Sequence, residues 1–468
     1  MSFTYRSKGK AGMSEEGTRK HPVDEVLPLP KLALYGFQHV LAFYAGAVVV
    51  PILVASGIGL SPQQLVYLIN ADLFTCGIAT IIQAWGFWKI GVRLPIVQGV
   101  TFTAVAPMIA IGQGAATPTA ALLAIYGATI TSGVVMFLAA PVLGRVLRLF
   151  PPVVTGTVLT IMGLLLIPNA LTDAAGGAAL KGKPDFGSWK HLAYAGGTVL
   201  FIVLLYRLRR PFLSSVAILL GLVGGTVVSW MLGDTSFDQV GRSHWFGVTT
   251  PFHYGAPTFQ IGPCIAMLLV MLVTVVETVG DSKATGQIVG KPVSDGDITR
   301  ALRADGLSTF LGGTLNAFPY TCFAQNVGLV RLTRVRSRFV VVAAGFIMMI
   351  LGLFPKAAAY VASIPPDVLG GAAMVMFGMV AVVGIQTLGQ ADLRDERNAL
   401  IVGISVGMAF VPSTIPAFGE NMPRDVASIL NSGIVLGSLT AVLLNLFFNV
   451  LTRRPPADTE ESVPATAS

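Results

Sequence analysis

The chain has 468 residues, of which 53% are hydrophobic and only 12% are charged, and its mean hydropathy is +0.73. A soluble globular protein carries about 25% charged residues, and half that share cannot cover a surface that faces water. The high apolar content also excludes a disordered chain. The composition therefore predicts a polytopic membrane protein whose outer surface is covered by lipid.

Positive charge collects in alternate connections between the apolar segments, and the formal net charge is +8. Because cytoplasmic loops carry an excess of Lys and Arg, we interpret this charge as a topology signal and expect no nucleic-acid partner. The inner set includes Arg207, Arg209, Arg210, Arg331, Arg334, Arg336 and Arg338. Both termini are then cytoplasmic, in a multi-pass protein of the inner or plasma membrane of the cell.

The length sets the expected number of spans. A helix needs about 20 residues to cross the hydrocarbon, and connections bring each unit to about 30, so residues 31–451 hold about fourteen spans. An even number agrees with two cytoplasmic termini. The polar ends, residues 1–29 and 453–468, are expected to be disordered cytoplasmic tails.

Two of the expected spans are poor simple helices. Leu94–Phe102 in the third span and Phe318–Asn326 in the tenth begin near a proline and suit an extended backbone. Each is third in its half of seven spans, and an odd-numbered repeat inverts the topology between halves. Paired interruptions of this kind indicate a binding site at the membrane midplane. The extended backbone must be buried or line a cavity because lipid cannot satisfy its polar groups.

Two carboxylates stand in the eighth span, within the segment Val270–Asp281. Glu277 and Asp281 are four residues apart and therefore share one helical face. Carboxylates inside a membrane usually face a cavity and serve transport or proton relay. The alternatives are a structural polar contact for Glu277 and an interfacial position for Asp281.

Three further polar groups lie in the first and ninth spans. Asp305 stands near the start of the ninth span, where an ion pair with Arg300 or Arg303 is the alternative to a functional role. Gln38 and His39 form the polar pair of the first span. A buried histidine of this kind is more often a satisfied structural group than a ligand or proton relay.

Polar residues also mark both interruptions. Gln325 and Asn326 open a short helix, and a side-chain amide offers the donor and acceptor that match the lactam edge of a nucleobase. Free backbone N–H groups at the helix start point into the same gap. Thr101 and Phe102 hold the corresponding break in the third span. Helix capping is the alternative role for Asn326, and Thr333 is a candidate for capping or gating the site.

Enzyme chemistry and metal binding are not indicated. Cys76, Cys264 and Cys322 lie in apolar runs without a CxxC pair, so neither a zinc site nor a disulfide framework is expected. The sequence shows no set of nucleophile, general base and orienting residue that would indicate an enzyme. We expect no cofactor.

The segment Gln325–Arg334 resembles the signature of the nucleobase–ascorbate transporter family, also called nucleobase:cation symporter-2. That signature is Gln, Glu or Pro, then Asn, any residue, Gly, four residues, Thr, and finally Arg, Lys or Gly. Gln38-His39, Glu277 and Ala304-Asp-Gly306 are also similar to the family. The resemblance extends from about Leu29 to Leu451.

The resemblance implies an all-α fold of fourteen transmembrane segments in a seven-plus-seven inverted repeat, with extended segments in spans 3 and 10. It divides the chain into a core domain, a gate domain and two tails, with homodimers formed through the gate. The core comprises residues 30–143 (spans 1–4) and 258–356 (spans 8–11), and the gate comprises residues 144–257 (spans 5–7) and 357–452 (spans 12–14).

The resemblance also implies site residues. Glu277 and Gln325 are similar to the substrate-binding residues of the family, and backbone beside Phe102 and Ala324 would complete the pocket. Asn326 follows Gln325 in the signature and is expected beside the substrate.

Coupling and selectivity are implied in the same way. His39 and Asp305 look like the family residues tied to site architecture and proton coupling. Gln325 resembles the xanthine/uric acid branch of the family. Thr101 before Phe102 resembles members that accept uric acid, whereas Asp281 resembles members that accept xanthine. The implied activity is a symporter that imports oxidised purines with a co-transported proton by alternating access.

Three rival functions stay open from the sequence. One is a permease of the same family for uracil or another nucleobase, and one is an anion carrier of the same fold, against which Glu277 and Gln325 argue. A channel is the third, and it would need no coupled carboxylates.

Overall fold

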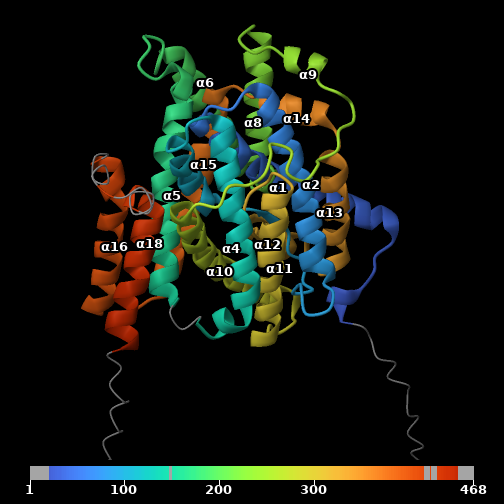
Figure 1. The fold of residues 1–468 in the computed structure, drawn as a ribbon. Coiled ribbons are helices and arrows are strands. Elements are labelled where there is room, and N and C mark those ends of the chain that lie inside the picture. The colour runs from blue at the N-terminus through green and yellow to red at the C-terminus, as the bar shows by residue number, and fades with distance from the viewer. Residues whose placement is uncertain (1–20, 147–149, 416–421, 423–429, 452–468) are drawn as a thin grey trace, which may run out of the picture.

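A computed structural model describes residues 21–146, 150–415, 422 and 430–451. In these residues the chain folds into a bundle of helices, many of them tilted, with one short pair of strands near the middle (Figure 1). The all-helical class that the family resemblance implies is therefore confirmed.

The first half of the chain contains the 3₁₀ helix η1 (Pro22–Asp24), α1 (Leu29–Ile58), α2 (Pro62–Trp85), β1 (Gln98–Val100), the 3₁₀ helix η2 (Phe102–Ala104), α3 (Val105–Gln113), α4 (Pro118–Val146), α5 (Pro152–Ala174), the 3₁₀ helix η4 (Ala178–Leu180), α6 (Trp189–Arg207), α7 (Pro211–Ser215), α8 (Ala217–Met231) and α9 (Asp238–Arg242).

The second half contains α10 (Ile261–Val289), α11 (Asp295–Thr314), β2 (Tyr320–Cys322), α12 (Ala324–Thr333), α13 (Arg338–Leu351), α14 (Pro355–Ala362), α15 (Pro366–Leu388), α16 (Glu396–Thr414), α18 (Gly433–Asn445) and the π-helical turn η6 (Leu446–Val450).

Eight helices of the described residues are long and apolar enough to cross a membrane. A ninth span results if α13 and α14, which meet at a bend of 85°, are counted together. Phe102–Gln113 and Ala217–Met231 are apolar but shorter. Helix length alone thus accounts for eight or nine of the roughly fourteen expected spans.

Several helix starts follow from local sequence. Proline occupies the first position of α2, α5 and α15, where its missing N–H costs no hydrogen bond. At α2, Ser61 accepts from the backbone N–H of Gln64, and the Gln64 side chain accepts from the N–H of Ser61. This reciprocal cap satisfies two donors that the helix itself leaves unpaired.

Both interrupted spans contain the expected extended backbone. Strands β1 and β2 pair antiparallel, with Gln98 opposite Cys322 and Val100 opposite Tyr320. Gly99, between them, is necessary because a Cβ atom there would lie 2.5 Å from the ring of Phe43. After each strand the chain returns to helix, through η2 into α3 and directly into α12.

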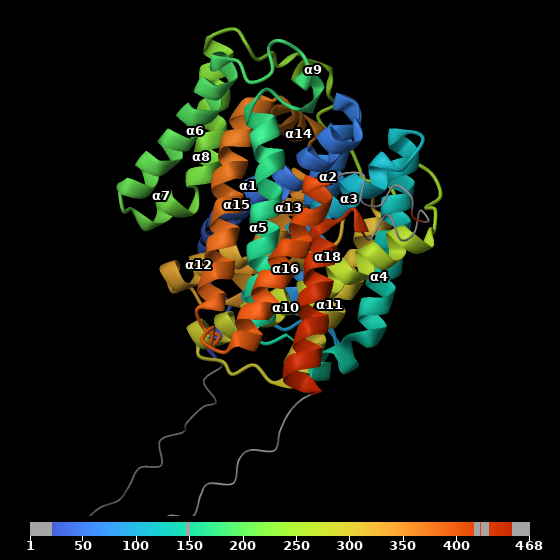
Figure 2. The ribbon, with the colours of Figure 1, turned by 90° about the vertical axis from the view of Figure 1, so that its left-hand side faces the viewer.

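Helices from distant parts of the sequence pack side by side. Helix α4 packs against α10 and α11, and α2 packs against α13. A second group is built on α5, which contacts α15, α16 and α18 (Figure 2). Helices α6 and α8 pack together and join this group through α15. The largest buried apolar cluster surrounds the strand pair, so the interruptions lie in the protein interior.

The chain just before α1 is ordered, which differs from the disordered tail expected for residues 1–29. Val23 is completely buried, and His21 Nε2 lies 3.2 Å from the carbonyl oxygen of Gly290. Asp24 pairs with Arg338 at 2.7 Å. These contacts fasten residues 21–25 to the body of the protein, while residues 1–20 and the tail at 453–468 lie outside the described residues.

Candidate substrate-binding site

The site is built where the two strands end and helices begin. Phe102 follows β1 by two residues, and its ring lies 5.8 Å from that of Phe323, which directly precedes α12. The Phe102 ring also lies 5.9 Å from that of Phe377 in α15. Aromatic side chains thus link both interruptions to the neighbouring helix group.

Glu277 points its carboxylate at the interruption of the third span. It stands in α10 and is half-buried, and the Thr103 hydroxyl donates to its Oε1 at 3.0 Å. The same hydroxyl lies 2.8 Å from the sulfur of Met162 in α5. A carboxylate inside a membrane-spanning helix, beside an interrupted span, can accept hydrogen bonds from a polar ligand.

Asp281 lies one turn beyond Glu277 on α10 and is also half-buried. Within the described residues, Asp281 has neither an ion pair nor a hydrogen bond. The two carboxylates share one face of the helix, as their spacing predicts. Helix α10 continues to Val289, so it does not end before Asp281, as the interfacial alternative for Asp281 required.

The start of α12 is open. Ala324 and Gln325 form its first two residues and are exposed, whereas Asn326 is buried. No side chain caps this helix start. The Gln325 amide can consequently offer a donor and an acceptor to a ligand, together with the first backbone amides of the helix.

Asn326 does not cap the helix, which was the alternative role that the sequence left open. Its amide nitrogen donates to the carbonyl oxygen of His39 and lies 3.1 Å from His39 Nδ1. Both residues are buried. Asn326 therefore ties the site helix α12 to α1, and His39 is a satisfied group within this contact rather than a lone one. Gln38, the neighbour of His39, is half-buried.

Asp305 is fully buried in α11 and accepts hydrogen bonds from three side chains. Gln98 of β1 donates at 2.5 Å, Gln83 of α2 at 3.2 Å and Thr278 of α10 at 2.5 Å. Three donors on one carboxylate satisfy most of its acceptor capacity. Asp305 is thus the hub that joins α2, β1 and α10.

The alternative of an interfacial ion pair for Asp305 is not observed. Arg300 pairs with Asp297 at 3.4 Å instead, and Arg303 has no ion pair with any described acidic residue. Asp305 lies too deep for either arginine, with a relative exposure of 0%.

Two other expected residues have local contacts. The Thr101 hydroxyl accepts from the backbone N–H of Thr103 at 3.2 Å and so caps η2. The Thr333 hydroxyl donates to the carbonyl oxygen of Leu329 at 2.9 Å and accepts from the N–H of Val335. Thr333 therefore caps the end of α12.

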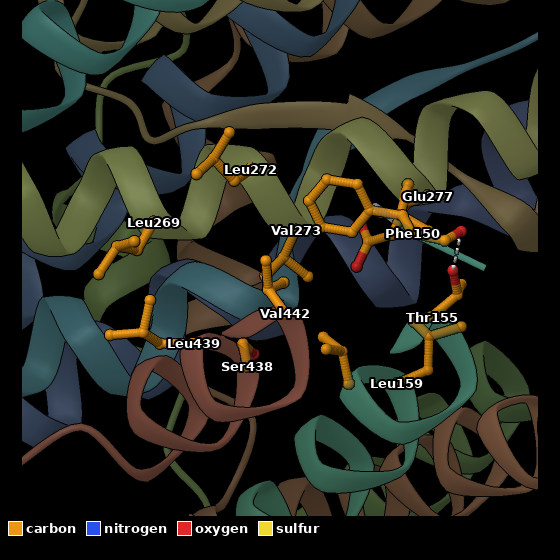
Figure 3. A pocket seen from close by; sticks show the side chains of 12 residues that line it. Phe150, Thr155, Leu159, Leu269, Leu272, Val273, Glu277, Ser438, Leu439 and Val442 are labelled. Atoms are coloured by element: carbon orange, nitrogen blue, oxygen red, sulfur yellow. Dashed lines mark hydrogen bonds between the residues drawn. The ribbon is translucent and has the colours of Figure 1, made fainter. Parts of the chain in front are cut away.

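A cavity of about 60 Å³ lies between α10 and the helices α5 and α18. Figure 3 shows Glu277 at one end of it, beside Phe150 and Thr155, with leucine side chains at the other end. Apart from Glu277, Thr155 and Ser438, its walls are apolar. This cavity borders the site on the side of the α5 group and is too small for a bicyclic ligand.

Sequence reasoning missed several polar residues of this region. Gln98 and Thr103 stand in or beside the interruption of the third span, and Thr278 follows Glu277 directly. Asp72 is a buried carboxylate in α2. The rule that selected Glu277, a carboxylate inside an apolar span, would also have found Asp72.

Paired interrupted segments inside a helical membrane protein are typical of membrane carriers. Comparison with known proteins makes this specific. Residues 30–418 match the model of a permease family. The chain belongs to this family, the nucleobase–ascorbate transporter or nucleobase:cation symporter-2 family, and is a transporter rather than an enzyme.

The uric acid transporter UacT of Escherichia coli (strain K12) is 44% identical over 429 residues, which covers 91% of this chain and 88% of that relative. The xanthine permease of Bacillus subtilis (strain 168) is 43% identical over 425 residues, with 91% and 95% covered. Among solved structures, the transmembrane domain of the cyanobacterium bicarbonate transporter BicA has a TM-score of 0.58 at 15% identity. The match covers 90% of this chain and 98% of the BicA chain, and it shows only that the two share a fold.

Proposed function

We propose that this nucleobase permease is a proton-coupled symporter that imports the oxidised purines xanthine and uric acid. Glu277 and Gln325 support the proposal. The Glu277 carboxylate contacts the interruption of the third span, the exposed Gln325 amide lies in that of the tenth, and the strand pair brings the two interruptions together. The names of the relatives UacT and of the Bacillus subtilis xanthine permease support this substrate class.

In this proposal the purine lies between the start of η2 and the start of α12. Glu277 accepts from purine N–H groups, Gln325 bonds the lactam edge, and Phe102 contacts the planar ring. Backbone beside Phe102 and Ala324 completes the pocket. Thr101 and Asp281 border the ligand and set the preference between the two purines, and Asn326 keeps α12 in place.

Alternating access then moves a core domain against a gate domain. The core comprises residues 30–143 and 258–356, the gate comprises residues 144–257 and 357–452, and the two repeats of seven spans have inverted topology. The contacts of Thr103 with Met162 and of Phe102 with Phe377 are core-to-gate contacts in this division. Both contacts involve residues beside the proposed substrate position.

Proton coupling rests on the buried acids of the core. Two carboxylates this close, Glu277 and Asp281, resist full ionisation when the site is empty, so protonation near them is linked to substrate capture. Asp305 and His39 hold the architecture that links the strand pair to the helices.

In this proposal both termini are cytoplasmic, and the protein forms homodimers through the gate domain. Mass measurement of the protein in lipid nanodiscs will test the dimer.

The decisive experiment is counterflow in proteoliposomes. Vesicles preloaded with unlabelled xanthine should accumulate labelled xanthine and labelled uric acid, while labelled uracil should exchange poorly. An inward proton gradient should drive net accumulation of either purine. Exchange of uracil or of bicarbonate in place of the purines would instead indicate the uracil-type or anion-carrier alternatives.

A further inference from the structure

The first residue of strand β1 is held by two different helices. The backbone N–H of Gln98 donates to the hydroxyl of Thr80 in α2, the helix that precedes the strand, at 3.0 Å. Its side-chain amide donates to Asp305 in α11, a helix from the other half of the chain, at 2.5 Å. A threonine and an aspartate thus fix both the backbone and the side chain of one strand residue.

The first residue of strand β2 is held in the same way. The backbone N–H of Tyr320 donates to the hydroxyl of Thr309 in α11, the helix that precedes this strand, at 3.0 Å. The Tyr320 hydroxyl donates to Asp72 in α2, the helix of the other half, at 3.0 Å. Asp72 therefore binds the first side chain of β2 as Asp305 binds the first side chain of β1.

The surroundings of the two aspartates differ. Asp305 accepts from three side chains, whereas the Tyr320 hydroxyl lies near both the Asp72 carboxyl and the Asp72 carbonyl oxygen, the latter at 3.2 Å. The remaining partner of Asp72 is the weakly donating thiol of Cys76, at 3.8 Å. Asp72 is 1% exposed and pairs with no Lys or Arg of the described residues.

An ionised carboxylate in such surroundings would be buried without a cation and with few donors, which is very costly. A proton on the carboxyl removes that cost. The protonated carboxyl group can also donate to the Tyr320 hydroxyl. That hydroxyl can then donate to the backbone carbonyl oxygen of Asp72, so both contacts are hydrogen bonds. Burial without a paired cation therefore favours the neutral acid, and the two contacts of the Tyr320 hydroxyl are compatible with it.

We propose that Asp72 is a positioning residue of the transport site, which holds Tyr320 as a neutral acid and thereby fixes the start of α12. Tyr320 opens β2, and α12 begins two residues after that strand ends, so a displaced Tyr320 moves Ala324 and Gln325 with it. Asp72 and Asp305 are equivalent supports of the two interruptions. The inference rests on the proposed purine transport only for its functional readout.

The test combines Asp72→Asn, Asp72→Leu, Tyr320→Phe and the double variant Asp72→Leu/Tyr320→Phe. Losing one buried hydrogen bond should raise the half-saturating purine concentration about three- to tenfold in Asp72→Leu and Tyr320→Phe, at similar protein abundance. The double variant should lose no more than either single variant. An asparagine side chain has a donor where the protonated acid has one. The purine affinity of Asp72→Asn should therefore lie within about twofold of the native value, and its pH profile should match that of the native protein.

Tyr126→Phe is the matched control, because Tyr126 is a buried tyrosine of α4 whose hydroxyl donates to the backbone carbonyl of Asn316 at 3.3 Å. Its purine affinity should stay at the native value. A defect in Asp72→Asn equal to that of Asp72→Leu, or a shifted pH profile, would overturn the neutral acid. Additive losses in the double variant would overturn the Asp72–Tyr320 contact.

Thermal unfolding of the purified protein gives a readout that needs no substrate. The unfolding midpoints of the same four variants should show the same non-additivity. If the native protein takes up neither purine while this coupling persists, the proposed function fails and the contact stands. If purine uptake is normal but the coupling is absent, the positioning role fails alone.

Discussion

Glu277 is bound on one side by Thr103 and open on the other, as expected of a carboxylate that waits for a ligand. A glutamine at this position keeps an oxygen that can accept from Thr103, so the exchange removes the charge and leaves the local contact in place. Glu277→Gln therefore tests the charge itself.

We expect Glu277→Gln to lower purine affinity about tenfold to more than a hundredfold, because a desolvated charged hydrogen bond contributes roughly 1.5–3 kcal/mol. Initial rates of labelled xanthine uptake over a concentration series measure the effect, with membrane abundance determined in parallel. Glu396→Gln, at the exposed start of α16, is the control and should behave like the native protein. Native uptake kinetics in Glu277→Gln would remove Glu277 from the site.

Thr101 and Asp281 should separate the two purines. Uric acid carries an additional oxo group on its imidazole ring, and we expect the small Thr101 side chain to leave room for that group. Asparagine is as good a cap as threonine, so Thr101→Asn keeps the start of η2 and fills only that space. It should depress uric acid uptake more than xanthine uptake, measured by competitive inhibition of labelled purine uptake.

Asp281→Met should act in the opposite direction and depress xanthine uptake more than uric acid uptake, since it removes a charged acceptor. The same competition assay measures it. Parallel losses of both purines in the two variants would show that these positions support folding or coupling instead of selectivity.

At the level of single residues, the sequence was a good guide to which groups matter and a poor one to their partners. Glu277 and Asp305 stand out because a carboxylate inside an apolar span is costly. The partners of Asp305 do not stand out, since Gln98 is 207 positions away and meets it only in the folded chain. Asn326 illustrates the same limit, because its bond to His39 joins residues 287 positions apart.

At the level of elements, the two interruptions were predictable from proline and β-branched residues, which disfavour helix. The register of β1 with β2 was not, because it depends on how α2 and α11 place the strand ends. Segments too short to cross as one helix, such as Phe102–Gln113, also cannot be recognised as spans by length.

Gly99 sets how closely the strand pair approaches the aromatic cluster. A Cβ atom would lie 2.5 Å from the Phe43 ring and 2.6 Å from the Phe323 ring, both buried. Overpacking of this kind costs about 1–3 kcal/mol, so Gly99→Ala should lower the thermal unfolding midpoint of the purified protein. Gly403→Ala in α16, where a Cβ atom meets nothing within 4 Å, should leave it unchanged or slightly higher. Equal midpoints for the two variants would mean that the strand pair adjusts freely.

At the level of the whole molecule, α10, which packs with α4 and α11, also contacts α5 and α18 of the group built on α5. Glu277 belongs to this boundary, because it lines both the interruption and the small cavity between these helices. Any movement of one group past the other must change that cavity. In the proposed mechanism, this boundary would connect substrate binding with the movement that alternating access requires.

Ser438 offers a way to block this movement. It lies in α18, lines the cavity across from α10, and is buried (Figure 3). In a background without the three native cysteines, Ser438→Cys should transport purines, because the change is small. Alkylation with N-ethylmaleimide should then abolish uptake, since the added group fills the cavity, and bound xanthine should slow the alkylation. The matched variant Ser236→Cys, on the exposed segment before α9, should be alkylated without loss of uptake. Full uptake by alkylated Ser438→Cys protein would show that the two helix groups do not move against each other at this boundary.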